Sequence, residues 1–137
     1  MSLPYPWQRL GGLAPLTLVA HHGGPMGWAD HARRTVSLRD DLSGPERRCT
    51  LMHELLHLHN GPQPRGLRAK EEEQVRRSTA RLMLPDLDAL GAALAWSHSL
   101  DEAAEELGVD IYVLRKRLRH LSAAELRHLR LRLSDIA

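Results

Sequence analysis

The chain has 137 residues, of which 42% are hydrophobic and 26% charged, and its formal net charge is +2. This size and composition fit one ordinary globular domain, and no apolar stretch is long enough to span a membrane. The single cysteine excludes an internal disulfide, and the first residues lack the basic segment and apolar run of a secretory signal, so we expect a cytoplasmic protein.

The N-terminal part of the chain predicts two short strands. Residues 1–15 are rich in proline and glycine and indicate an irregular arm, and residues 16–20 form an apolar run typical of a strand. The turn that follows begins with His21 and His22, which could contribute to a second metal site, although we favour a solvated loop. Residues 35–38 carry alternating apolar side chains and predict a second strand, so we expect a small antiparallel sheet.

Helix-start signals divide the rest of the chain. Ser43 and Glu46 form a capping box that predicts a helix to about residue 59, where a stretch rich in glycine and proline ends it. Similar signals predict further helices at about residues 67–84, 87–96, 101–107 and 111–121, and after Ser122. The fold class is therefore α+β and mostly helical.

The first of these helices contains the sequence His53-Glu54-Leu55-Leu56-His57. Residues four apart lie one turn apart on the same face of a helix, so His53 and His57 can present two imidazole nitrogens to one metal ion. Glu54 is rotated by about 100° from His53. That offset suits a carboxylate that takes a proton from a metal-bound water, and the pattern is a signature of zinc metalloproteases. A purely structural histidine pair is the alternative, but in so apolar a helix it would need partners that a metal supplies.

A catalytic zinc site needs a third protein ligand and one open position. The nearest carboxylates, Glu71, Glu72 and Glu73, lie near the start of the next predicted helix, and the glycine- and proline-rich connection can lay that helix against the first. Without the histidine motif, these glutamates would instead indicate a solvated first turn favoured by the helix dipole. His59 competes as a ligand, but it points about 200° away from His57 on a regular helix.

These segments resemble the ImmA/IrrE family of zinc metallopeptidases over most of the chain. The similar stretches are the strand at residues 35–38, the helix approach and motif at residues 47–57, and the helix from Glu72 to Pro85, which ends in a Leu-Leu-x-Pro-like signature. The resemblance implies a zincin-like core and makes Glu72 the third zinc ligand.

The sequence departs from the family pattern at Arg76, where members often carry Asp or Asn. A carboxylate that would orient an active-site histidine is therefore missing or supplied elsewhere, and Asp30 and Glu73 are the alternatives we consider. The substitution makes catalytic strength harder to infer than metal binding.

Residues 101–118 have the pattern of a helix-turn-helix, with Gly108 in the turn and a basic second helix. Taken alone, the basic residues suggest DNA contact through phosphates, but the second helix lacks Asn or Gln side chains that read bases. Similar helix pairs pack on the peptidase core in the resembling family. We therefore favour a structural or partner-binding role, and Tyr112 could reach the cleft as an oxyanion stabiliser.

Cys49 lies one turn before His53 and continues the column of potential ligands. Ligands at i, i+4 and i+8 on a straight helix span about 12 Å, which is too far for one ion. We expect Cys49 to be a small buried residue.

We expect one metallopeptidase-like domain over residues 1–137, with a zincin core at residues 1–97 and a helical subregion at residues 98–137 packed on it. The substrate backbone is expected to pair with an edge strand near residues 35–38. By resemblance, the substrate is a regulatory protein such as a phage-type repressor.

The main hypothesis is a zinc-dependent endopeptidase of the gluzincin type, in which His53, His57 and Glu72 hold Zn²⁺ and Glu54 is the catalytic base. The alternative is a DNA- or protein-binding regulator that uses the helix-turn-helix, with a structural or degenerate zinc site.

Overall fold

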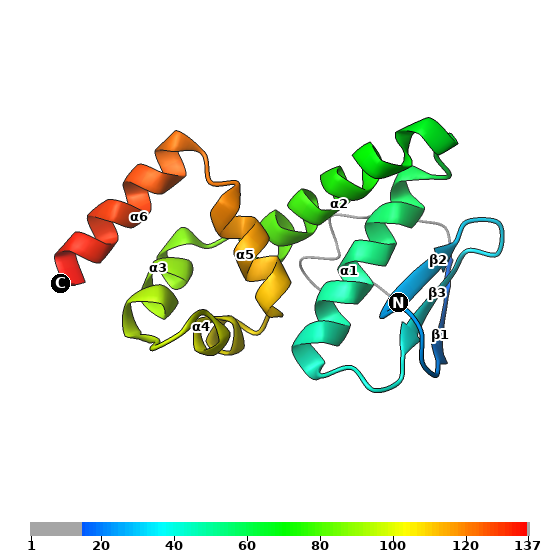
Figure 1. The fold of residues 1–137 in the computed structure, drawn as a ribbon, viewed down its shortest axis with the longest axis horizontal. Helices are drawn as coiled ribbons and strands as arrows, with labels where there is room; N and C mark the ends of the chain where they lie inside the picture. Colours follow the sequence, from blue (N-terminus) through cyan, green and yellow to red (C-terminus); the bar gives the residue numbers. More distant parts are fainter. Residues whose placement is uncertain (1–14, 137) are drawn as a thin grey trace.

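The computed structural model describes residues 15–136, so the irregular arm expected at residues 1–15 lies outside the described residues except at its last position. Three strands precede all the helices (Figure 1). The elements in chain order are β1 (Thr17–His21), β2 (Gly27–Asp30), β3 (Thr35–Arg39), α1 (Gly44–Asn60), the 3-10 turn η2 (Arg65–Leu67), α2 (Arg68–Met83), α3 (Leu87–Trp96), α4 (Leu100–Leu107), α5 (Ile111–Arg119) and α6 (Ala123–Ile136). The fold is α+β and mostly helical with a small sheet near the N-terminus, which confirms the predicted fold class.

The sheet has the strand order β1-β3-β2 and is mixed, which corrects the expected antiparallel sheet. β2 pairs antiparallel with β3, whereas β1 pairs with β3 in parallel. The chain reverses direction twice between β1 and β3, once before β2 and once after it, so these two strands run the same way. The four residues of β2 contain no apolar run, which is why the sequence did not reveal this strand.

β3 occupies the centre of the sheet, and its residues Val36, Ser37 and Leu38 are buried. Both edges of β3 are already paired with neighbouring strands. The expectation that a substrate could pair with residues 35–38 is therefore wrong, and the edges available are those of β1 and β2.

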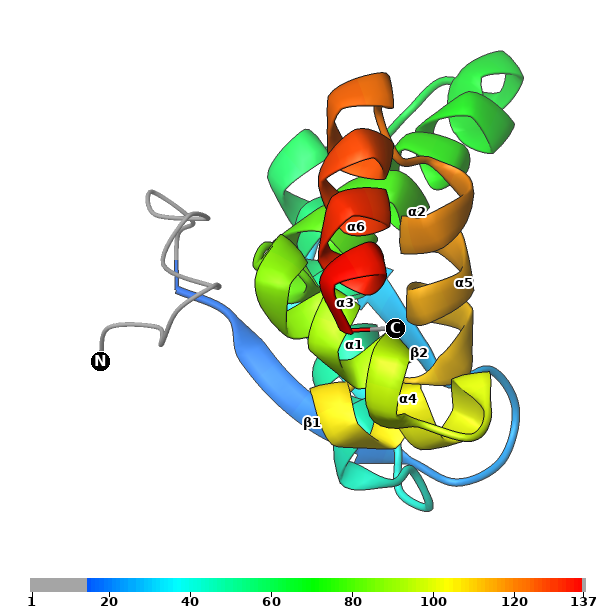
Figure 2. The same cartoon turned by 90° about the vertical axis from the view of Figure 1, so that its left-hand side faces the viewer.

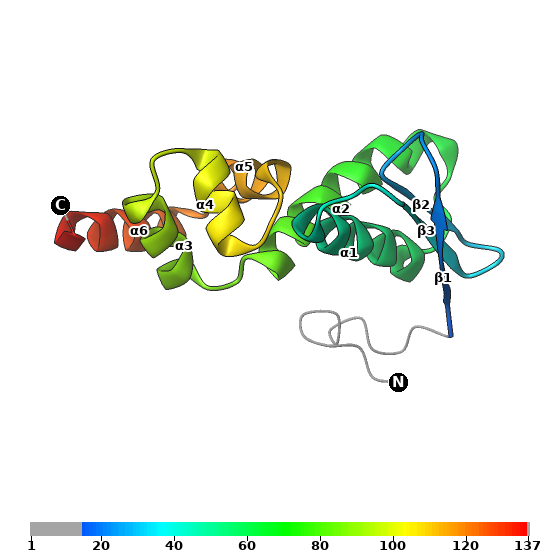
Figure 3. The ribbon, with the colours of Figure 1, turned by 90° about the horizontal axis from the view of Figure 1, so that it is seen from below.

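α1 lies against the sheet and begins and ends where the sequence predicts (Figure 3). The Ser43 hydroxyl accepts the Glu46 N–H at 3.2 Å, and the Glu46 carboxylate accepts the Ser43 N–H at 3.0 Å, which confirms the capping box. Gly61 ends the helix with a positive φ of 77° and donates its N–H to the carbonyls of the last turn. A buried cluster joins α1, β3 and α2 and contains Val36, Leu38, Met52, Leu55, Leu56, Leu58 and Val75.

A second buried cluster lies between α2 and the C-terminal helices. Its members come from α1 through α6 and include Cys49, Ala80, Leu84, Leu90, Ala103, Leu114 and Leu129. α6 runs alongside α3, and α5 packs against α2 (Figure 2). α3 packs with the helices that follow it. The predicted boundary at residue 97 between a zincin core and a helical subregion stays a prediction. Within residues 15–136, no helix combines the length and the apolar character needed to cross a bilayer.

α4 and α5 form the helix pair that the sequence predicts, joined at Gly108 in the left-handed conformation with φ 71°. Asp110 then caps α5 by accepting the Val113 N–H at 2.8 Å. Arg48 of α1 donates to the Gly108 carbonyl at 2.6 Å. This bond ties the turn between α4 and α5 to the helix that carries the histidine motif.

Candidate metal centre and cleft

His53 and His57 lie one turn apart on α1, and their rings point to the same side of the helix. Their Nε2 atoms are 3.1 Å apart. Both side chains are largely enclosed, because Glu71 and Glu72 of α2 lie against their rings. The apolar residues of α1 face the sheet on the other side of the helix. The spacing of the motif has therefore produced the local geometry expected from a regular helix.

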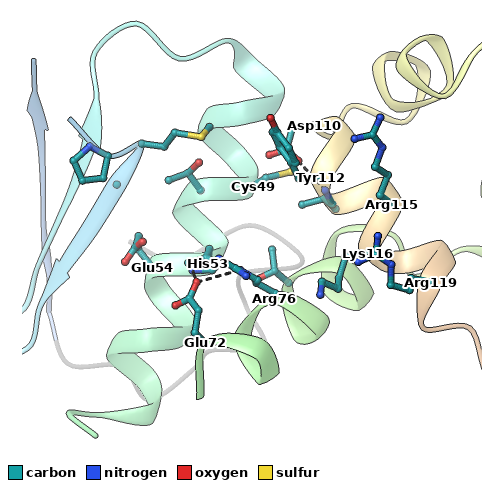
Figure 4. A pocket seen from close by; sticks show the side chains of 16 residues that line it. Cys49, His53, Glu54, Glu72, Arg76, Asp110, Tyr112, Arg115, Lys116 and Arg119 are labelled. Carbon is teal, nitrogen blue, oxygen red and sulfur yellow. Dashed lines mark hydrogen bonds and ion pairs between the residues drawn. The ribbon is translucent and has the colours of Figure 1, made fainter. Parts of the chain in front are cut away.

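Glu72 of α2 completes a group of three side chains, with His53 and His57, that could hold a metal ion. Figure 4 shows two of the three, His53 and Glu72, turned towards each other. The carboxylate oxygens of Glu72 lie 2.9 Å from His53 Nε2 and 2.8 Å from His57 Nε2. His53, His57 and Glu72 are the one group of three or more potential metal ligands among residues 15–136. Tetrahedral ligands each about 2.1 Å from a zinc ion are about 3.4 Å apart. The observed spacing is a few tenths of an ångström shorter, and two imidazoles with one carboxylate are a donor set that suits zinc, so the residues present fit such an ion.

Glu71 contacts the same histidine from its other side. The Nδ1–H of His57 donates to both Glu71 oxygens, at 2.7 and 2.8 Å, and the Asn60 side-chain amide donates to Glu71 at 2.9 Å. A proton held on Nδ1 leaves the lone pair of Nε2 free to bind a metal. The carboxylate that orients an active-site histidine is therefore present.

The two alternatives considered for this orienting role are wrong. Glu73 points to α5, where it pairs with Lys116 at 3.0 Å, and Asp30 accepts the Arg33 N–H in the turn after β2. Successive residues on a helix are rotated by about 100°, so Glu73 points away from His57, which Glu71 and Glu72 both reach. Arg76 lies one turn after Glu72 and pairs with it at 3.3 Å.

Glu54 is buried and lines the cleft without joining the group of three. Burial raises the pKa of its carboxyl above the ordinary value, while nearby His53 and His57 oppose that shift. A raised pKa suits a group that must accept and return a proton near neutral pH.

The charges at the centre favour an ionised Glu72. Hydrogen bonds from His53 and then His57 hold the pKa of Glu72 well below its usual range. The hydrogen bond to Glu72 raises the pKa of His57, with a further contribution from Glu71. His57 and Glu72 would have to give up the proton they share before they could hold a metal, so the affinity of the site for a metal would fall as pH decreases.

His53 and Glu72 of this group line an open cavity of about 690 Å³. Its lining comes from Pro25–Gly27 and from α1, α2 and α5. In Figure 4, α5 lies on the other side of the pocket from α1. Tyr112 of α5 lines the cavity and is 70% exposed. Its role as an oxyanion stabiliser stays a prediction.

The remaining candidate residues lie outside the centre. His59 is exposed and takes no part in the group of three, as its position on the helix predicts. Cys49 is buried at the cavity wall, and burial raises the pKa of its thiol to about 12, so it behaves as the small core residue we expected. His21 stacks on Trp28 with ring centroids 3.8 Å apart, and His22 is exposed, so this pair forms no second site of three ligands among the described residues.

Sequence reasoning missed the role of Glu71 and the close packing of Gly27 against α1. The available signal for Glu71 was its place next to Glu72 on a helix that must face the end of α1. That signal indicates a histidine partner only when the rotation of α2 about its own axis is known, because each neighbour points in a different direction.

A mostly helical α+β fold with two histidines and a glutamate converging in an open cleft defines a metallopeptidase-type protein. The family model described as Peptidase_M78, IrrE N-terminal-like domain, matches residues 16–119. The chain therefore belongs to this peptidase family, which confirms the resemblance to the ImmA/IrrE proteins. No curated protein and no solved structure matches the chain significantly.

Proposed function

We propose that the chain is a zinc-dependent endopeptidase in which His53, His57 and Glu72 hold the metal. The observation that carries this proposal is the convergence of two imidazole nitrogens and one carboxylate, 2.8–3.1 Å from one another. Two of these groups, His53 and Glu72, line an open cleft. When bound, zinc supplies a Lewis acid that polarises a carbonyl and lowers the pKa of a bound water to about 7.

Glu54 is the proposed catalytic base. It lies one residue after His53 on α1 and lines the same cavity, so its carboxylate can take a proton from water there and pass it to the leaving amine. Glu71 keeps the His57 ring in place through Nδ1. Asn60 in turn holds Glu71, so three side chains determine the orientation of one ligand.

The free edge of β2 is the proposed binding site for the substrate backbone. β2 is an edge strand, and the residues leading into it form one side of the cavity. An extended peptide that pairs with this edge would pass beside Glu54, because Gly27 of β2 lies against that residue.

Family membership supports a protein substrate. The finer assignment, a regulatory protein such as a phage-type repressor cleaved to relieve repression, is our proposal from the resemblance. Such a substrate would place the protein in the cytoplasm, in agreement with its single cysteine.

The decisive experiment replaces Glu54 by Gln. We expect E54Q to bind zinc stoichiometrically and to lose cleavage of a proteome-derived peptide library by at least about a hundredfold, since general base catalysis contributes 10²–10⁴ in rate. Products are identified by mass spectrometry and zinc by elemental analysis. E105Q, which changes an exposed glutamate of α4, is the matched control and should cleave like the wild type. Full cleavage by E54Q would rule out the mechanism.

The alternative, a regulator that binds DNA through α5, is less well supported. The exposed face of α5 lines the cavity, so other parts of the chain lie across from it. A duplex would have less room there than at a helix that projects from the surface. Tight DNA binding at about 0.15 M salt that survives loss of zinc and of Glu54 would favour the regulator.

A further inference from the structure

The side of the cavity formed by α5 carries most of its positive charge. Tyr112, Arg115, Lys116 and Arg119 all line the cavity, and their spacing of three or four residues places them on one face of the helix. The same cavity is lined by Pro25–Gly27 and by His53 and Glu72 of the candidate centre. Figure 4 shows α5 across from the helix that carries His53.

Among residues 15–136, two of these cations have no acidic side chain as a partner. Lys116 pairs with Glu73 at 3.0 Å. Arg115 and Arg119 are exposed, and no carboxylate in the described part of the chain lies within ion-pair distance of either. Asp110, the carboxylate nearest to them along α5, is engaged as the cap of the helix. Two guanidinium groups therefore face the cavity with their hydrogen-bond donors available.

The spacing of these arginines matches an extended peptide. Arg115 and Arg119 are four residues apart, which is about 6 Å along a helix axis. Side chains on one face of an extended strand repeat about every 6.6 Å. A peptide that lies in the cleft can therefore direct two alternate side chains to the two arginines, and a guanidinium binds a carboxylate through two parallel hydrogen bonds.

We propose that Arg115 and Arg119 select substrate segments that carry acidic residues at alternate positions on the α5 side of the cleft. This inference rests on the proposed endopeptidase function and names the class of substrate for the same site. The two arginines are specificity residues, which act on the choice of peptide and take no part in the chemical step.

A protein segment fits this surface better than duplex DNA does. A recognition helix must project into the major groove, which is about 12 Å wide. Here the same face of α5 lines a cavity together with Pro25–Gly27, α1 and α2, so it does not project from the molecule as a recognition helix does. The face also lacks the Asn and Gln side chains that read base edges.

The test measures binding to the full-length, zinc-loaded E54Q chain, so that no cleavage occurs. Two fluorescent octapeptide pools are compared by anisotropy, one with Asp and Glu at alternate positions and one with Asn and Gln in their place. We expect the acidic pool to bind roughly tenfold more tightly at low salt, which corresponds to about threefold for each of two exposed ion pairs. The preference should shrink at about 0.15 M salt, where exposed charges are screened.

Substitutions assign the preference to its residues. In E54Q/R115Q/R119Q the ratio of the two affinities should fall to about one. In the matched control E54Q/R127Q/R130Q, which removes two exposed arginines of α6 and so the same net charge, the tenfold ratio should persist. Equal affinities for the two pools, a ratio that survives R115Q/R119Q, or a ratio lost equally in the α6 variant would each overturn the proposal.

Two further readouts separate this proposal from the others. If the wild type cleaves the peptide library, the cleaved sites should be enriched in Asp and Glu, and the enrichment should disappear in R115Q/R119Q. Absence of all cleavage contradicts the proposed function, whereas cleavage without acidic enrichment contradicts only the inference. Binding of a 20-base-pair duplex at about 0.15 M salt through the same arginines, without a preference between the peptide pools, would assign this face to nucleic acid instead.

Discussion

His57 is held on both sides of its ring by adjacent glutamates of α2. Glu71 accepts the Nδ1–H at 2.7 Å, and Glu72 lies 2.8 Å from Nε2. The two carboxylates differ by one residue in sequence and therefore by about 100° around the helix. One reaches Nε2, the nitrogen proposed to bind the metal, and the other accepts the proton of Nδ1.

Glu71→Ala should weaken zinc binding by about 10- to 100-fold, the usual effect of removing the partner of a histidine ligand. Competition with a chromogenic chelator measures this affinity. E73A is the matched control, because Glu73 lies on the same helix but pairs with Lys116, and its zinc affinity should equal that of the wild type. A wild-type affinity in E71A would show that the hydrogen bond does not position the ligand.

At the scale of elements, the approach of β2 to α1 depends on a glycine. A Cβ atom on Gly27 would lie 2.7 Å from Thr50 Cγ2, 3.1 Å from the Ser37 carbonyl oxygen and 3.3 Å from Glu54 Cγ. These distances are shorter than ordinary contacts, so any side chain at this position pushes the strand away from the helix. The proposed substrate edge and the proposed base are adjacent because residue 27 has no side chain.

Gly27→Ala should lower cleavage by about tenfold or more, because a small misplacement of substrate against catalytic groups is costly in rate. The variant should also lose about 1–3 kcal/mol of unfolding free energy through overpacking. Cleavage assays and chemical denaturation measure the two effects.

A compensating change tests the cause. Thr50→Ser removes the Cγ2 atom that makes the closest contact, so G27A/T50S should recover part of both losses. Recovery is partial because the contact with the Ser37 carbonyl remains. If the double variant is no better than G27A, the clash with Thr50 is not the reason for the loss.

Another element-level contact joins α5 to α6 and to the end of α2. Arg117, which is buried, donates to the Leu84 carbonyl at 3.0 Å and to Glu125 at 2.5 Å. Its Nη1 atom has no hydrogen-bond partner among the described residues. The buried charge of Arg117 is therefore compensated mainly by Glu125. The hydrogen bond from Arg117 lowers the pKa of Glu125 from 4.5 to about 2.

Glu125→Gln should lower the unfolding free energy by about 2 kcal/mol at neutral pH, because it leaves a buried cation without its counter-charge. The folded-state pKa of Glu125 is below its ordinary value, so this contribution is fully present above about pH 4.5 and is lost as pH falls towards 2. Urea denaturation of both proteins across this range should show the difference shrinking with acidity. Gln keeps the capping interaction of the helix start, so a difference that does not depend on pH would contradict the electrostatic explanation.

At the scale of the whole molecule, the candidate metal centre lies where the two buried clusters meet. α1 and α2 contribute residues to both clusters and all three residues of the centre. α5 packs on α2 and closes one side of the cavity above it. A metal that joins α1 to α2 should therefore stabilise the molecule as well as serve catalysis.

Removal of the metal with a chelator should lower the unfolding free energy. Zinc at 100 times its dissociation constant contributes about 2.7 kcal/mol when it binds only the folded state. Thermal unfolding with and without chelator measures the difference, and elemental analysis identifies the metal. His57→Ala, which removes one proposed ligand, should unfold at the same temperature in both conditions. A chelator effect of wild-type size in H57A would place the metal elsewhere.

Local interactions made much of this protein predictable from its sequence. The spacing of His53 and His57 requires only a regular helix, and the caps at Ser43 and Ser122 require only nearby groups in the chain. The histidine spacing and the helix caps involve residues only a few positions apart, so the sequence pattern alone predicts them.

The resemblance pointed to Glu72, but only the tertiary structure decided that Glu71 contacts His57 from the other side, which strand forms the edge at the cleft, and which side of α5 lines it. Each outcome depends on how one element is rotated and placed against another, and residues far apart in the chain determine that packing together. The rotation of α2 against α1 directs Glu72 to the two Nε2 atoms and Glu71 to Nδ1, because neighbouring side chains on a helix point in directions that only packing can assign to a partner.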